Sequence, residues 1–79
     1  MQVSVLFFAF ARDRMKTGAA SFELPDGSTV ETLYREHLAE RLKAPIDQWM
    51  FSVNRVWAEP GTELHPGDEV AVIPPVSGG

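Results

Sequence analysis

Cysteine is absent from this chain of 79 residues. Its absence excludes a disulfide framework, a thiolate metal site and a nucleophilic thiol. The sequence also has no glycine-rich phosphate loop and no apolar run long enough to span a bilayer. The two histidines, His37 and His65, lie far apart without companion ligands. We therefore expect neither a metal nor a cofactor bound by this chain, and no membrane partner.

Positive charge is scarce as well. Lys and Arg number 7 against 11 Asp and Glu, a formal net charge of -4 at pH 7. This balance argues against nucleic acid or an anionic membrane as the main partner. The apolar stretch 5–11 resembles the end of a signal peptide, but no basic region precedes it, so we expect a cytoplasmic protein.

Alternating apolar residues predict strands at both ends of the chain. In residues 2–10, Val3, Val5 and Phe7 share one face, which we expect to be buried. Residues 20–24 form a second predicted strand after a polar loop over 12–18, and residues 69–73 form the last. Two shorter strands, 50–53 and 56–57, are predicted to flank a tight turn at Asn54 and Arg55.

One helix is predicted in the middle of the chain. Ser28-Thr29-Val30-Glu31 has the pattern of a capping box, with Ser28 as the N-cap and Glu31 reaching back to it. An apolar stripe at helical spacing follows, formed by Val30, Leu33, Tyr34, Leu38 and Leu42. Pro45 ends the predicted helical segment. The order of hairpin, helix and further strands predicts an α+β, ubiquitin-like β-grasp fold. In this fold a mixed sheet carries one main helix on one face, and the first and last strands lie side by side.

The last six residues differ from the domain that precedes them, so we divide the chain into a β-grasp domain, 1–73, and a tail, 74–79. Two prolines cannot continue a strand ladder and favour an extended chain. The two glycines have no side chains, so a narrow channel in another protein could hold them closely. A frayed terminus is the alternative. The tail consists of Pro74, Pro75, Val76, Ser77, Gly78 and Gly79.

Outward-facing side chains of the first and last strands predict an exposed apolar patch. If Val70 and Val72 face the core, then Ala71 and Ile73 face outward beside Leu6 and Phe8, and Trp57 is a further candidate. Such a patch marks a partner interface more often than chance would give. Alternatively, Phe8 and Trp57 complete a small core.

Three segments together carry a resemblance to a known family. They are Val5-Leu6-Phe7-Phe8-Ala9 followed by Arg12, Ser52-Val53-Asn54, and Gly67-Asp68-Glu69-Val70-Ala71 leading to the tail. Over essentially the full chain they resemble the small subunit of molybdopterin synthase, in the ubiquitin-like sulfur-carrier family.

This resemblance implies a sulfur carrier that is not catalytic alone. An adenylating enzyme would use ATP to activate the Gly79 carboxylate, and a sulfur donor would convert it to a thiocarboxylate. The tail, 74–79, would insert into the large subunit and pass sulfur to cyclic pyranopterin monophosphate. The family also implies a heterotetramer with the large subunit.

By the same resemblance, four residues fall at the partner interface: Phe8, Arg12, Trp57 and Ile73. Three alternatives stay open from the sequence. One is a sulfur carrier for thiazole, cysteine or tRNA thiolation, another is a protein modifier joined through Gly79, and the third is a plain β-grasp interaction module.

Overall fold

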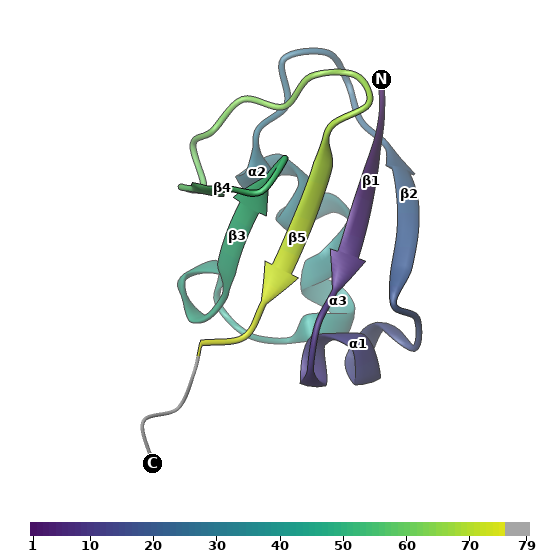
Figure 1. Ribbon diagram of the computed structural model, residues 1–79, viewed down its shortest axis with the longest axis vertical. Coiled ribbons are helices and arrows are strands. Elements are labelled where there is room, and N and C mark those ends of the chain that lie inside the picture. Colours follow the sequence, from purple (N-terminus) through teal and green to yellow (C-terminus); the bar gives the residue numbers. More distant parts are fainter. Residues whose placement is uncertain (76–79) are drawn as a thin grey trace.

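A five-stranded sheet and one helical segment form two layers in the computed structural model, which describes residues 1–75 (Figure 1). The sheet order is β2-β1-β5-β3-β4. The strands are β1 (Gln2–Phe7), β2 (Ala19–Glu23), β3 (Met50–Val53), β4 (Val56–Ala58) and β5 (Glu69–Ile73). This arrangement is the predicted α+β, β-grasp fold.

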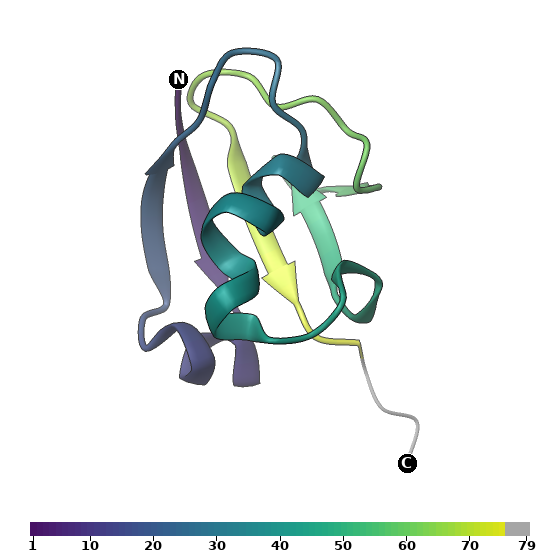
Figure 2. The same ribbon diagram turned by 180° about the vertical axis from the view of Figure 1, so that it is seen from behind.

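The main helix runs diagonally across one face of the sheet (Figure 2). It comprises α2 (Val30–Leu33), a π-helical stretch η1 (Tyr34–Leu38) and α3 (Ala39–Leu42). A short 3-10 helix, η2 (Ile46–Gln48), follows it and leads into β3. A further short helix, α1 (Phe10–Met15), lies at the end of β1.

The first and last strands lie side by side, as predicted. β1 and β5 pair in parallel from Ser4↔Glu69 to Phe7↔Val72, whereas β1–β2, β3–β4 and β3–β5 are antiparallel. Because β1 and β5 run in the same direction, their carboxyl ends lie at the same end of the sheet. The short helix α1 also lies at that end (Figure 1).

The core lies between the sheet and the helix. The predicted inward sets of β1 and β5 are buried, and so is the whole apolar stripe of the helix. Leu33, Leu38 and Leu42 are each 0% exposed. The apolar side chains that recur every second residue in the strands and about every 3.6 residues in the helix therefore pack into one core.

The helix begins one residue later than predicted. Thr29, not Ser28, is the N-cap: its Oγ1 accepts from the Thr32 backbone N at 3.3 Å, and the Thr32 Oγ1 accepts from the Thr29 N at 3.2 Å. Ser28 is buried in the preceding turn, where its hydroxyl donates to the Pro25 carbonyl at 2.6 Å. The expected capping box through Glu31 was wrong because the turn already uses the Ser28 side chain.

Residues 8–15 also differ from the prediction of a long first strand followed by a polar loop. β1 ends at Phe7, and α1 occupies Phe10–Met15. Ala9 has φ 51° and ψ −132°, and the Ala11 N donates to the Phe8 carbonyl at 3.1 Å. These values fit the first central position of a type II′ turn, where glycine is usual. The turn reverses the chain so that Ala11 and Met15 enter the core.

The turn at Asn54 and Arg55 follows the prediction, and a second turn lies before β5. Asn54 and Arg55 both have positive φ, 51° and 71°, as a two-residue type I′ hairpin turn requires. Gly67 has φ 83°, and the Asp68 N donates to the His65 carbonyl at 3.1 Å, which agrees with a type II turn over Pro66 and Gly67.

Replacing Ala9 with glycine should relieve the positive φ of the turn before α1. An alanine held in this sparsely populated backbone region costs about 1–3 kcal/mol, and the added freedom of glycine costs about 0.5–1 kcal/mol. We expect Ala9→Gly to leave the free energy of unfolding unchanged or to raise it by up to about 1 kcal/mol. Chemical denaturation measures this change.

The matched control is Ala39→Gly, at the start of α3, where φ is −58°. Glycine there should lower the free energy of unfolding by about 1 kcal/mol. If Ala9→Gly destabilises the protein as much as Ala39→Gly does, the Ala9 conformation is not strained.

Candidate functional site

One face of the sheet lies opposite the helix and has no element of residues 1–75 packed over it. Figure 1 views the molecule from this open side, and Figure 2 views it from the helix side. Outward residues of β1, β5, β3 and β4 therefore meet solvent directly. We call this surface the open face.

A single row of paired residues crosses the open face. Leu6 of β1 pairs with Ala71 of β5, Ala71 pairs with Ser52 of β3, and Ser52 pairs with Trp57 of β4. Directly paired residues point to the same side of a sheet. The two small side chains therefore lie in the middle of the row, between a leucine and a tryptophan.

This order of sizes produces a hollow of about 410 Å³ on the open face. We call it the face hollow. It is lined by Leu6, Phe8, Ser52, Arg55, Trp57, Glu69, Ala71 and Ile73. Its floor is apolar, while Arg55 and Glu69 provide one charge of each sign. An apolar centre with a polar rim is the usual anatomy of a protein interface.

Three of the four predicted interface residues line the face hollow. Trp57 is 64% exposed and Phe8 is 46% exposed, while Ile73 is half-buried. These exposures exclude the alternative in which Phe8 and Trp57 complete the core. The tryptophan in the core is Trp49, which is 5% exposed and donates from Nε1 to the Tyr34 hydroxyl at 3.1 Å.

Arg12, the fourth predicted interface residue, lies apart from the face hollow. It belongs to α1, and its guanidinium packs over Gly18, with Nε 3.4 Å from where a Cβ of Gly18 would stand. The structure thus places Arg12 at the β1–β2 end of the molecule. Its role in binding a partner stays a prediction.

Sequence reasoning missed the polar part of the hollow. Asn54 holds it in place: its N donates to the Glu69 carbonyl at 2.8 Å, and its Oδ1 accepts from the Glu69 N at 3.0 Å. The Asn54 Nδ2 also donates to Asp68 Oδ1 at 2.9 Å. These contacts fix the β3–β4 turn, and with it Arg55, against the start of β5. The Asn-Arg turn signal was visible in the sequence, but its partner strand was not.

The tail begins beside the face hollow. β5 ends at Ile73, which pairs with Met50 of β3, and the next residue, Pro74, is buried while Pro75 is exposed. The Phe8 N donates to the Val72 carbonyl at 3.2 Å, so Phe8 lies next to the end of β5. Four predicted tail residues lie outside the described residues: Val76, Ser77, Gly78 and Gly79.

Residues 1–75 offer neither a cluster of metal ligands nor a membrane-spanning helix. No group of three or more His, Asp or Glu side chains in this part of the chain could hold a metal ion. No helix there is long and apolar enough to cross a membrane.

The fold and its hollowed open face first define a class, the ubiquitin-like β-grasp proteins. A solved structure of small archaeal modifier protein 1 from Haloferax volcanii has this fold, with a TM-score of 0.79 at 21% identity over 95% of this chain and 98% of that chain. A solved complex of subunits 1 and 2 of the molybdopterin-converting factor from Helicobacter pylori contains a chain with a TM-score of 0.71 at 27% identity, and all of both chains is covered.

Sequence comparison is more specific. The ThiS family model matches residues 5–79. The molybdopterin synthase sulfur carrier subunit of Chlamydomonas reinhardtii is 37% identical and covers 100% of both chains. The subunit of the same name from Homo sapiens is 34% identical, over 99% of this chain and 94% of the relative. The chain therefore belongs to the ThiS family, and the resemblance to the small, sulfur-carrier subunit of molybdopterin synthase is confirmed.

The two tryptophans should respond oppositely to truncation. Trp49→Ala removes a buried ring and should lower the free energy of unfolding by about 3–5 kcal/mol. Trp57→Ala removes a side chain that is 64% exposed, so it should change stability by less than about 1 kcal/mol. Denaturant unfolding of both variants measures the contrast, and similar losses would show that Trp57 supports the core.

Proposed function

We propose that this chain carries sulfur on its C-terminal Gly79 as the small subunit of a molybdopterin synthase. The observation that supports this most strongly is the full-length similarity to curated sulfur carrier subunits of that enzyme in an alga and in humans. The chain itself supplies no catalytic side chain in this proposal. Its contribution is a docking surface and an activated terminus.

The chemistry at Gly79 follows from what a carboxylate can do. A carboxylate is a poor electrophile and must first be activated. In a partner enzyme, an oxygen of the Gly79 carboxylate attacks the α-phosphorus of ATP, which forms an acyl-adenylate and releases pyrophosphate. A sulfur nucleophile from a donor then adds to the acyl carbon and displaces AMP. When the donor sulfur is a persulfide, this step gives an acyl disulfide. A further thiol then attacks the donor's sulfur, forms a disulfide with the donor and releases the Gly79 thiocarboxylate. Since the sequence has no cysteine, it offers no thiol as another attachment point.

Delivery of the sulfur is assigned to the large subunit. The tail, residues 74–79, would enter that subunit and transfer sulfur to cyclic pyranopterin monophosphate. The face hollow lies beside the start of the tail, so a partner that covers the hollow also receives the tail. A complex of the corresponding two subunits has been solved for the Helicobacter pylori proteins, which supports a large subunit as the partner.

The covalent step can be tested by intact-protein mass spectrometry. The chain is incubated with an adenylating enzyme, ATP and a sulfur source, and we expect a mass gain equal to one oxygen replaced by sulfur, located at Gly79. A variant that lacks Gly79 is the control and should show no gain. An unchanged mass in the complete chain, with the enzyme active on a known carrier, would contradict the proposal.

Binding to the large subunit tests the face hollow. Trp57→Ala should weaken the affinity by roughly 30-fold, because a central aromatic that fills a partner pocket contributes about 2 kcal/mol or more. Titration calorimetry with the purified large subunit measures the change.

Val56→Ala is the matched control for this measurement. Val56 precedes Trp57 on β4 and is similarly exposed, at 68%, but it points to the other side of the sheet. We expect its affinity to stay within about twofold of the unmodified chain. Equal losses in both variants would show that the open face is not the binding surface.

A further inference from the structure

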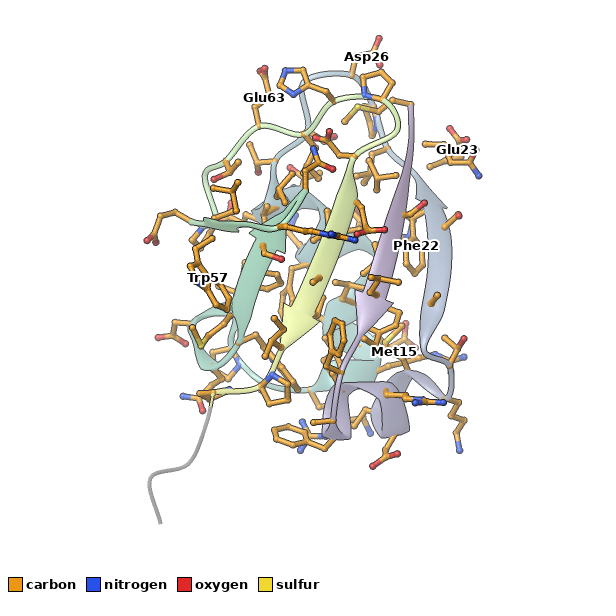
Figure 3. The ribbon with its side chains drawn as sticks, viewed as in Figure 1. Met15, Phe22, Glu23, Asp26, Trp57 and Glu63 are labelled. Atoms are coloured by element: carbon orange, nitrogen blue, oxygen red, sulfur yellow. The ribbon has the colours of Figure 1, made fainter. Side chains whose placement is uncertain are left out.

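A second hollow, of about 360 Å³, lies at the β4 edge of the molecule. We call it the edge hollow. Its lining includes Ile46 of η2, Phe51 of β3, and Trp57 of β4. Neither the resemblance nor the face hollow accounts for it. Figure 3 shows Trp57 on this side of the sheet, whereas Phe22 and Glu23 lie on the opposite, β2 side.

The rim of the edge hollow is acidic. Asp47 and Glu59 both line it and are exposed, and no Lys or Arg is among the lining residues. Neither carboxylate forms an ion pair within residues 1–75. The face hollow differs, because its rim has one cation and one anion, Arg55 and Glu69. An apolar hollow lined by two carboxylates that form no ion pair within residues 1–75 is complementary to an apolar side chain accompanied by cations.

The two hollows are neighbours that share one lining residue, Trp57. Met50 of the edge hollow also pairs with Ile73 of the face hollow. Met50 is 42% exposed, so apolar surface extends from one hollow to the other. A partner seated on the open face could therefore contact both hollows through Trp57 and Met50.

The sheet edge favours an extended occupant. β4 is the outermost strand of the sheet and pairs only with β3 among the described residues. The outer side of such a strand presents backbone N–H and C=O groups that another extended chain can pair with. A segment that runs along β4 would have its side chains next to Trp57 and Glu59.

We infer that the edge hollow is a second docking site for the large subunit. Its occupant is an extended segment of that subunit, with one apolar side chain inserted into the hollow and Lys or Arg residues opposite Asp47 and Glu59. This inference rests on the proposed function, since it identifies how the same partner extends its contact beyond the face hollow.

A double charge reversal tests the inference. Asp47→Lys with Glu59→Lys should weaken binding to the purified large subunit on the order of tenfold at low ionic strength, because cations would then face cations. The effect should shrink as salt is raised. Titration calorimetry at two ionic strengths measures both quantities, and thermal unfolding verifies that the variant is folded.

The control changes the net charge equally at another place. Glu36→Lys with Glu40→Lys reverses two exposed carboxylates on the helix, and the affinity should stay within about twofold. Equal losses in the two double variants, or no loss in the first, would overturn the edge site.

If the unmodified chain itself fails to bind the large subunit, the proposed function fails and this site fails with it. Phe8 lines the face hollow but not the edge hollow, so normal binding by Phe8→Ala together with tenfold weaker binding by the Asp47 and Glu59 variant would contradict the face hollow alone.

Discussion

The parallel pairing of β1 with β5 is the contact on which the rest of the structure depends. It joins Ser4 to Glu69 and Phe7 to Val72, so the two ends of the domain become neighbours in the centre of the sheet. Loop closure over so long a separation costs entropy, which the buried residues of both strands offset. The same pairing places the end of β5, where the tail begins, next to Phe8.

The two faces of the sheet differ in how fully they are packed, because their side chains differ in size. On the helix side, large apolar residues fill the space between the layers. On the open face, Ser52 and Ala71 are small and lie between Leu6 and Trp57, which leaves a hollow that no side chain of residues 1–75 fills. Exposed apolar area of this kind is costly for a monomer and is favourable once a partner covers it. A chain of 79 residues can thus devote one sheet face to stability and the other to recognition.

Periodicity predicted most of the strands, the main helix and their order, because each depends on local patterns of apolar residues. The same patterns left Trp57 open between an outward patch and the core, and only the resemblance placed it at the partner interface; its exposed fraction of 64% decides for the patch. The errors fall where a local pattern competes with a tertiary contact. Ala9 adopts a turn that alanine disfavours, since the helix after it buries Met15. Ser28 resembles an N-cap in sequence, but the preceding turn uses its hydroxyl. The place of Arg55 beside Glu69 could not be predicted, because it depends on the pairing of β3 with β5.

We propose above all that the open face, and not the helix face, receives the large subunit. Backbone amide NMR of the labelled chain, with and without that subunit, tests it most directly. We expect the largest chemical-shift changes at Leu6, Ser52, Trp57 and Ala71, with small changes along α2 and α3. Changes concentrated on the exposed side of the helix, with the sheet signals unmoved, would contradict it.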